Sequence, residues 1–306
     1  MSHTPPSYQA ALAALASANP DLIVMTAENR APIRHLPAAL GPRFVDVGIC
    51  EQTLIGAAAG LALRGRTPVV HALAAFLTMR AFEFIRTDVG IGGLPVKLIG
   101  YIPGFLSEAN GPTHQAIEDV ALMRGIPGMQ VVCPADGEEL AAALPAIVAS
   151  PAPCYVRYNP LPPEVPHVTP FTLGRAEVIS EGQAGGVALL TYGFLLREAA
   201  RAAALLAERG VPVRLVDLRT LAPIDEAAIV AAAGAADLLV TIEDHFATGG
   251  LYSIVAEVLL SHGVCCRVHP ISLGASWFKP ALLPEVLDYE GFTGARLAAR
   301  VLAAWR

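Results

Sequence analysis

The chain has 306 residues, enough for two domains of ordinary size, and its net charge is −6. Because its basic residues are scattered, it lacks the electrostatic footprint of a nucleic-acid-binding protein. Hydrophobic residues make up 54% and charged residues 16%, which is more apolar than a free monomer should need. Either a membrane protein or a subunit with large interfaces would explain this composition. Gly, Pro or a charge interrupts every apolar run before the roughly 18 residues of a spanning helix, so we favour interfaces.

The N-terminus and the cysteines indicate the compartment. Residues 1–6 have no basic segment followed by an apolar core, so no signal peptide is expected. The five cysteines are odd in number and include no Cys-x-x-Cys pair, which makes a zinc site and a disulfide framework unexpected. We therefore expect a cytoplasmic protein that binds neither a membrane nor nucleic acid.

The first half of the chain alternates predicted helices with predicted strands. Ala- and Leu-rich or small-residue segments predict helices at 8–17, 52–63, 79–89 and 137–149. Short apolar runs predict strands at 22–26, 43–47, 68–72, 95–100, 130–133 and 154–158. Because these runs are mostly apolar without a polar alternation, the pattern favours a parallel sheet covered on both faces.

A proline-rich segment separates this half from a second series of the same kind. Residues 159–170 carry five prolines and no periodicity, which is typical of a linker. Beyond it, helices are expected at 195–209 and 250–261, and strands at 187–191, 213–217, 238–242 and, at an edge, 266–269. The fold class is therefore α/β, with two parallel-sheet domains in tandem. We place them at 1–160 and 173–306, joined by a linker at 161–172.

The string Gly48-Ile49-Cys50-Glu51-Gln52 follows a predicted strand and opens a predicted helix. In open α/β sheets, ligands bind beyond the carboxyl ends of the strands. A carboxyl group there, among Ile49, Cys50 and Leu54, would be desolvated, an environment that suits proton exchange near neutral pH. The alternative is an acidic residue that only complements the helix dipole.

A second string, Gly111-Pro112-Thr113-His114-Gln115, lies in a segment rich in turn-forming residues, just before a predicted helix. An imidazole on such a loop can donate a hydrogen bond to a substrate oxygen, and loops often carry functional residues. A surface or capping histidine is the alternative.

Three further side chains admit both a functional and a structural interpretation. Phe76 could contact a flat ligand, although aromatic residues at helical spacing usually belong to a core. His71 could face a polar site from the end of a strand, or be a hydrogen-bonded core histidine. His245 precedes Gly249 and Gly250, which permit close approach of the backbone, but an exposed turn is equally consistent.

Together, the two strings and the apolar stretch around Phe76 could grip a flat heterocycle, protonate a ring nitrogen and steer a substrate. The sequence shows no glycine-rich phosphate loop and no cluster with metal-ligand spacing. We therefore predict half a site, with the other half on another polypeptide.

Taken in order, these strings resemble the C-terminal half of transketolase, and best the stand-alone C-terminal subunit of split bacterial transketolases. Residues 43–52 match the segment around that family's cofactor-activating glutamate, and residues 71–86 resemble its cofactor-stacking region. Residues 110–119 match its substrate loop, and residues 240–250 resemble the signature of its C-terminal domain. The resemblance covers nearly the whole chain.

The resemblance implies a pyrimidine-binding domain followed by a transketolase C-terminal domain. It also implies thiamine diphosphate held jointly with an N-terminal partner subunit, which would carry the diphosphate site and the Mg²⁺ ligands, leaving no metal ligand on this chain. The implied reaction moves a two-carbon ketol unit from a ketose to an aldose.

By this resemblance, Glu51 would hydrogen-bond the aminopyrimidine nitrogen and Phe76 would stack on the pyrimidine, with Ile49 and Arg80 completing the cofactor contacts. The implied catalytic residues are Glu51, His114 and His71. The implied substrate-binding residues are Asn110, His114, Arg157 and His71.

The sequence departs from the family's pattern on the substrate side. Transketolases usually have Asp where this chain has Asn110, a change that keeps the shape and removes the charge. Arg157 matches a phosphate-binding arginine, but the arginine usual in the first helix is missing from residues 8–15. We therefore expect a partial phosphate grip and an unusual sugar or acceptor.

Other assignments stay open. The chain could be the β subunit of a 2-oxo acid dehydrogenase or resemble deoxyxylulose-phosphate synthase, although Gly111-Pro112-Thr113-His114-Gln115 argues against the dehydrogenase. It could also be a non-catalytic assembly subunit, against which intact Glu51 and Phe76 argue. The alanine-rich composition predicts a homodimer that recruits two partner subunits as α2β2, since twofold assemblies are the common solution.

Overall fold

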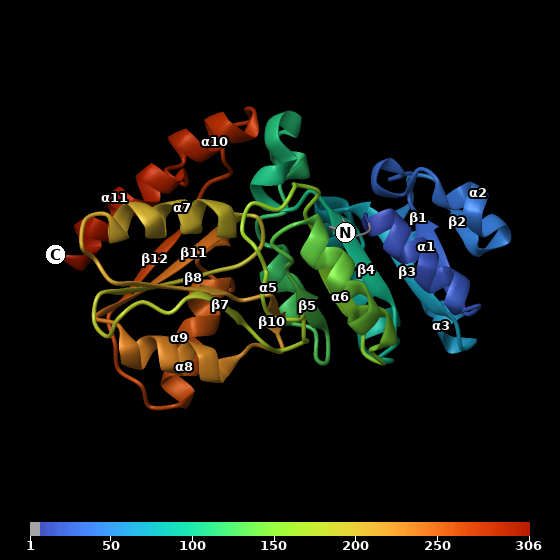
Figure 1. Ribbon diagram of the computed structural model, residues 1–306. Helices are drawn as coiled ribbons and strands as arrows, with labels where there is room; N and C mark the ends of the chain where they lie inside the picture. The colour runs from blue at the N-terminus through green and yellow to red at the C-terminus, as the bar shows by residue number, and fades with distance from the viewer. Residues whose placement is uncertain (1–6) are drawn as a thin grey trace, which may run out of the picture.

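The computed structural model describes residues 7–306. These residues form two mainly parallel sheets, each covered by helices (Figure 1). The first sheet has the strand order β10-β5-β6-β4-β3-β1-β2, and all its neighbouring strands are parallel except β10 with β5. Its strands are β1 (Leu22–Thr26), β2 (Phe44–Asp46), β3 (Thr67–Leu73), β4 (Lys97–Tyr101), β5 (Gln130–Val132), β6 (Cys154–Tyr158) and β10 (Thr220–Ala222).

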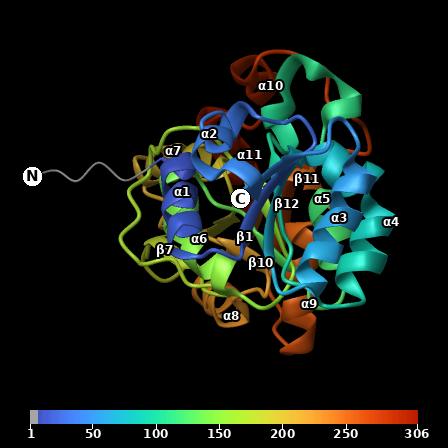
Figure 2. The same cartoon turned by 90° about the vertical axis from the view of Figure 1, so that its right-hand side faces the viewer.

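Helices cover both faces of the first sheet (Figure 2). One face carries α1 (Tyr8–Ala18), α2 (Leu36–Leu40) and α6 (Gly137–Ala149), and the other carries α3 (Glu51–Leu63), α4 (Phe82–Phe84) and α5 (Asp119–Arg124). Short 3₁₀ segments are η1 (Ala31–Ile33), η2 (Gly41–Arg43), η5 (Gly104–Asn110) and η6 (Pro112–His114), and π-helical turns form η3 (Phe76–Arg80) and η4 (Ile85–Gly90). The mostly apolar character of the interior strands follows from this arrangement, because helices cover both faces of the sheet.

The second sheet has the order β12-β11-β8-β9-β7, in which only β7 is antiparallel to its neighbour. Its strands are β7 (Glu177–Ser180), β8 (Val187–Thr191), β9 (Val213–Asp217), β11 (Leu238–Phe246) and β12 (Val268–Leu273). Helices α7 (Leu195–Ala207) and α11 (Gly294–Trp305) lie above the sheet in Figure 1, and α8 (Glu226–Ala235) and α9 (Leu251–Ser261) lie below it, while α10 (Leu283–Tyr289) extends toward the first domain.

The two domains share more than a linker. Strand β10 comes from the second half of the chain but completes the first sheet, pairing Thr220 with Val132 and Ala222 with Val131.

Buried ion pairs also join the two domains. Arg157 on β6 pairs with Asp119 and with Asp244 on β11. The second domain is therefore joined to the first through the β10 edge of the first sheet and through the buried ion pairs of Arg157.

The predicted α/β class with two parallel-sheet domains is confirmed. The edge strand is confirmed in place, although it begins at Val268 rather than at residue 266 and runs to Leu273. The helix predicted at 79–89 begins earlier, at Phe76, and consists largely of π turns. None of the helices within residues 7–306 has the length and apolarity needed to span a membrane.

Candidate active site

Glu51 begins α3 directly beyond the end of β2, where Gly48 adopts a φ of +73° to turn the chain. Its side chain is buried, and its Oε2 accepts a hydrogen bond of 2.8 Å from Nη1 of Arg80. Among the described residues, no donor reaches the second oxygen, Oε1. The carboxylate is thus fixed through one oxygen, which leaves the other available to a ligand.

Arg80 links Glu51 to the two aromatic rings of the site. Its guanidinium carbon lies 4.2 Å from the ring centroid of Phe76. The imidazole of His114 meets the same ring edge-on, with 4.8 Å between the centroids, and its Nδ1 lies 2.9 Å from Oγ1 of Thr113. Both rings are half-buried. Glu51, Arg80, Phe76 and His114 therefore form one continuous set of contacts, which we call the contact string.

Three structural elements supply this string. Glu51 comes from the start of α3, Phe76 and Arg80 from the π turn η3 that follows β3, and His114 from η6. A π turn has wider spacing than an α-helix, and such turns occur frequently at functional sites. The sequence predicted these four side chains separately, and the fold brings them together at the carboxyl edge of the first sheet, where open α/β folds bind ligands.

His71 is fully buried in β3, so it lies within the hydrogen-bonded core. Its Nδ1 lies 3.3 Å from the carbonyl oxygen of Met25, and its Nε2 lies 2.6 Å from the hydroxyl of Tyr8. Since a carbonyl only accepts, Nδ1 carries the proton and Nε2 accepts from Tyr8. Burial lowers the pKa of His71 to about 4, so the ring is neutral at pH 7. Its role toward a substrate stays a prediction, because a donor to substrate would first have to leave one of these partners.

The remaining predicted side chains lie outside the string. Ile49 and Asn110 are exposed, and the Asn110 amide donates to the carbonyl oxygen of Ser107 at 2.8 Å. Arg157 is buried, with Nε at 2.9 Å from Asp119 and Nη1 at 2.7 Å from Asp244. The predicted cofactor contact of Ile49 and the substrate contacts of Asn110 and Arg157 stay predictions.

His245 does not lie in an exposed turn; it is fully buried near the end of β11. Its Nδ1 donates to the carbonyl oxygen of Phe246 at 2.6 Å, and its Nε2 accepts from the amide of Ala121 at 3.3 Å. Burial lowers the pKa of His245, which keeps the ring neutral. The exposed-turn interpretation was therefore wrong, and the residue links β11 to α5 of the first domain.

A second polar cluster was missed by sequence reasoning. Glu139, His167, Glu177 and Asp217 bring ligand-capable atoms within 4.8 Å of one another. Arg219 lies among them, with its Nε 2.6 Å from Glu139 and a further ion pair to Glu177. A cavity of about 680 Å³ is lined by His167 and Arg219 and by no residue of the contact string. The four ligand-capable residues come from separate segments, so no spacing in the sequence could reveal the cluster.

Comparison with known proteins places both halves of the chain. Residues 3–160 match the transketolase pyrimidine-binding domain, and residues 174–297 match the transketolase C-terminal domain. A 6-deoxy-6-sulfo-D-fructose transketolase subunit of Clostridium sp. strain MSTE9 is 38% identical over 229 residues, covering 74% of this chain and 70% of that protein. An apulose-4-phosphate transketolase subunit of Phocaeicola vulgatus is 31% identical, covering 86% of this chain and 85% of that protein.

Two further comparisons extend over nearly the whole chain. The 1-deoxy-D-xylulose-5-phosphate synthase of Thermomicrobium roseum is 35% identical over 98% of this chain, which spans 49% of that enzyme. A solved structure described as a split gene transketolase in an inactive β4 tetramer superposes with a TM-score of 0.86 at 34% identity, covering 97% of this chain and 96% of that one. The chain therefore belongs to the transketolase family: it combines that family's pyrimidine-binding and C-terminal domains and is a homologue of split-gene transketolase subunits.

Proposed function

We propose that this chain is the catalytic subunit of a two-subunit, transketolase-like enzyme that transfers a two-carbon ketol unit from a ketose to an aldose through thiamine diphosphate. The contact string of Glu51, Arg80, Phe76 and His114 is the observation that carries the proposal. It joins a fixed carboxylate, an aromatic ring and an imidazole at the edge of the sheet where α/β folds bind ligands.

The string fits the pyrimidine half of the cofactor. Oε1 of Glu51 has no donor within the described part of the chain and could share a proton with a ring nitrogen of the aminopyrimidine, while Arg80 holds Oε2. The half-buried ring of Phe76 would stack on the pyrimidine, with exposed Ile49 beside it. When bound, thiamine diphosphate supplies the carbanion chemistry, and the protein supplies position and proton control.

On the substrate side, His114 is the proposed donor. The Thr113 hydroxyl can donate to its Nδ1, and no described residue forms a hydrogen bond with its Nε2, which can then donate to a sugar oxygen. Asn110 would contact a sugar hydroxyl from the exposed end of η5. We keep His71 and Arg157 as proposed substrate contacts, each of which would have to exchange a present partner, Tyr8 or a carboxylate, for the sugar.

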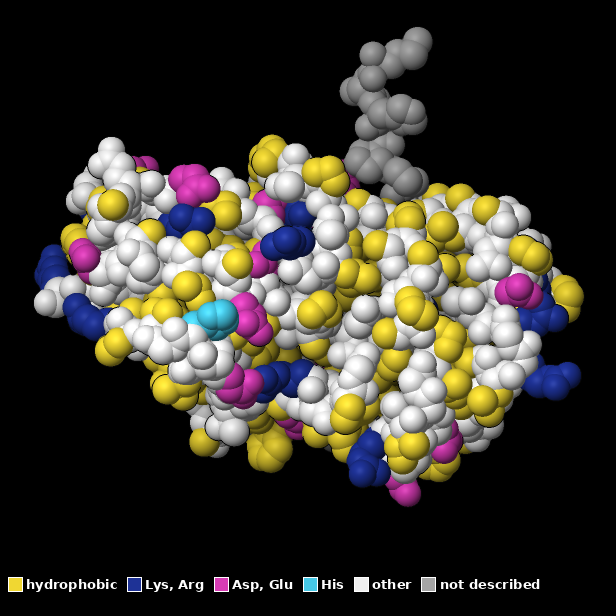
Figure 3. Space-filling model, turned by 90° about the horizontal axis from the view of Figure 1, so that it is seen from below, with side chains coloured by type: hydrophobic (Ala, Val, Ile, Leu, Met, Phe, Trp, Pro, Cys, Tyr) yellow, Lys and Arg dark blue, Asp and Glu magenta, His cyan; other side chains and the backbone are white. Residues whose placement is uncertain are grey.

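The proposal assigns the diphosphate and Mg²⁺ ligands to an N-terminal partner subunit. Named relatives are split-gene subunits, and the solved neighbour is described as inactive in its β4 form, both of which support the need for a partner. Ile49, Leu63 and Ile91 are each more than two-thirds exposed, and apolar side chains spread over the first-domain half of the face in Figure 3. Such exposure supports assembly, for which we propose an α2β2 tetramer. Five unpaired cysteines within the described residues support a cytoplasmic location.

The isolated chain is expected to bind thiamine diphosphate poorly. The diphosphate carries most of the ligand's charge, and its cradle is assigned to the partner. Titration calorimetry with Mg²⁺ should give a Kd at least about 100-fold weaker for this chain alone than for the two-subunit enzyme, which corresponds to about 2.7 kcal/mol. Micromolar, magnesium-dependent binding by the chain alone would contradict the half-site proposal.

Asn110→Asp is expected to change sugar preference without weakening cofactor binding. Asn offers a donor where Asp has only acceptors, so the two favour different hydroxyl arrangements. A hydrogen bond gained or lost is worth about 0.5–1.5 kcal/mol, which predicts a shift of roughly 2- to 10-fold in relative kcat/KM between sugars. The measurement is a sugar panel with cofactor titration. Asn19→Asp, the same change at the C-terminal end of α1, serves as the control. A uniform loss across all sugars would make Asn110 structural.

Product analysis tests the reaction class. Two relatives are named for a sulfonated fructose and for apulose 4-phosphate, so the panel should include sulfonated and phosphorylated ketoses with several aldoses. Ketol transfer would support the proposal. Release of CO₂ from pyruvate during condensation would instead favour a reaction like that of 1-deoxy-D-xylulose-5-phosphate synthase, and transfer to a lipoyl group would favour a dehydrogenase subunit.

A further inference from the structure

We propose that Gln115 is a positioning residue through which the C-terminal domain holds the η5–η6 loop, residues 104–115, in register with the contact string. The inference rests on the proposed function for its effect on catalysis. Its structural part rests only on contacts between the loop and the C-terminal domain.

Gln115 directly follows His114 and is fully buried. Its Nε2 donates to the carbonyl oxygen of Phe278 at 2.8 Å, across the boundary between the domains. Its Oε1 is buried without a hydrogen-bond partner in the structure. A buried amide oxygen without a hydrogen-bond partner destabilises a fold, so core packing alone would favour an apolar side chain here. The bond to Phe278 is the feature that distinguishes a glutamine from such a side chain.

Phe278 is itself fixed in place. It is buried, although residues 274–277 and 279–280 on either side of it are exposed. Its ring packs edge-on against Phe105 with 5.1 Å between centroids, and Phe105 packs in the same way against Phe292 at 4.9 Å. The acceptor for Gln115 is therefore anchored in a buried apolar cluster that Phe105 of the loop shares with the core of the C-terminal domain.

Phe105 lies at the other end of the η5–η6 loop, so the loop is attached at both ends. The amide of Phe105 donates to Oδ2 of Asp244 on β11 at 3.4 Å, and the amide of Gly104 donates to the carbonyl oxygen of Ala116 at 2.9 Å, which closes the loop at its base. Gly104 has a φ of +58°, and a Cβ there would lie 1.7 Å from Asp244, so only glycine fits.

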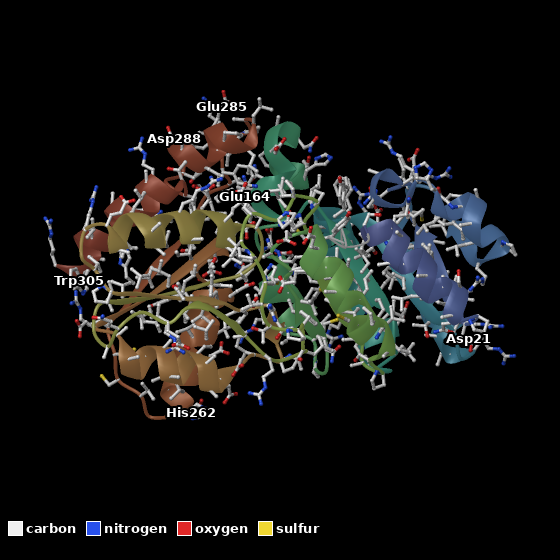
Figure 4. All side chains as sticks on the ribbon, viewed as in Figure 1. Asp21, Glu164, His262, Glu285, Asp288 and Trp305 are labelled. Carbon is white, nitrogen blue, oxygen red and sulfur yellow. The ribbon has the colours of Figure 1, made fainter. Side chains whose placement is uncertain are left out.

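Between its two attached ends, the loop reaches the surface of the molecule. Its segment η5 lies beside α10, the helix that carries the labelled residues Glu285 and Asp288 (Figures 1, 2 and 4). Residues 109 and 110 are exposed. Two of the side chains assigned to the substrate, Asn110 and His114, are thus carried by a loop whose two ends are held by contacts with the C-terminal domain. This gives that domain a role in the site although it supplies no residue of the contact string.

Loss of the Gln115 bond should displace His114 while leaving the cofactor contacts in place, because Glu51, Phe76 and Arg80 come from α3 and η3. A misplacement of about 1 Å at a reacting group can cost up to about 10²-fold in rate. We expect kcat/KM to fall by about 10-fold or more in Gln115→Met, which keeps the volume and removes the donor.

Gln115→Glu provides a readout that a purely structural role would not give. Only the protonated acid can donate to the Phe278 carbonyl, so its activity relative to wild type should fall as pH rises, whereas the loss in Gln115→Met should not depend on pH. Gln130→Glu is the matched control. Gln130 also has a buried, unpaired side-chain oxygen, but it lies at the start of β5, away from the loop.

The test combines hydrogen exchange on the full chain with kinetics on the two-subunit enzyme. The proposal predicts faster amide exchange in residues 104–118 and 274–280 in both Gln115 variants, unchanged exchange there in Gln130→Glu, and a cofactor Kd within about twofold of wild type. Unchanged exchange in the loop, kcat/KM within twofold of wild type, or a parallel loss of cofactor affinity would overturn it. If Gln115→Met does not fold, the pH series of Gln115→Glu decides. Hydrogen exchange needs neither partner nor substrate. It therefore tests whether Gln115 holds the loop even if the wild-type enzyme shows no ketol transfer.

Discussion

Replacing Glu51 by glutamine is expected to lower turnover of the two-subunit enzyme by about 10²–10⁴-fold while the chain stays folded. The amide keeps the volume and can still accept a hydrogen bond, but it cannot exchange a proton with the pyrimidine. Arg80, which donates to Oε2 at 2.8 Å, would face a neutral oxygen, so its bond should weaken rather than break. Steady-state kinetics together with a thermal melt would measure both effects.

Glu83→Gln provides the matched control, because Glu83 is exposed on α4, directly beyond the η3 turn. That variant should retain wild-type turnover. If Glu51→Gln also stayed within a factor of a few of wild type, Glu51 would have no part in proton transfer and the proposed mechanism would lose its central group.

Arg157→Met is expected to destabilise the chain by about 3–5 kcal/mol, since it would leave two buried carboxylates without their cation. Asp119 and Asp244 are both buried, and they lie 2.9 Å and 2.7 Å from the guanidinium nitrogens. Because one carboxylate belongs to each domain, loss of the guanidinium should weaken the contact between the domains and lower the stability of each domain. Urea unfolding of the purified chain would measure the change in free energy of unfolding.

An exposed pair of the same chemistry isolates the effect of burial. Arg296 and Asp288 are each 61% exposed, so Arg296→Met should change the free energy of unfolding by only about 0–1 kcal/mol. Equal, small effects in both variants would contradict the structural role of Arg157. A raised KM for phosphorylated sugars with unchanged stability would instead support its proposed contact with substrate phosphate.

Local patterns made the fold class predictable. The runs at 22–26 and 154–158 coincide with β1 and β6, because both are short, mostly apolar interior strands of the first sheet. The three-residue strand β10 was missed, since its place in the first sheet depends on pairing with β5 from the other half of the chain. The helix around Phe76 begins earlier than predicted. Its start could not be located from the sequence, because π turns have no distinctive spacing of apolar residues.

The site was predictable in parts that depend on contiguous strings. Glu51 and His114 could be singled out because Gly or Pro punctuates the chain beside each, whereas their link through Arg80 and Phe76 depends on three elements meeting at one sheet edge. The burial of His245 could not be foreseen, because α5 of the first domain covers it. The bond from Gln115 to Phe278 spans 163 positions of sequence, so no local pattern could indicate it.

The transfer of label between sugars tests the central claim most directly. This chain, its N-terminal-half partner, thiamine diphosphate and Mg²⁺ would be mixed with a ketose labelled at its first two carbons and an unlabelled aldose, and the products would be followed by NMR. We predict that both labelled carbons move together to the aldose, that either subunit alone is inactive, and that Glu51→Gln slows the transfer by about 10²–10⁴-fold. Transfer without the partner, or a complete two-subunit enzyme that moves no label to any aldose of the panel, would contradict it.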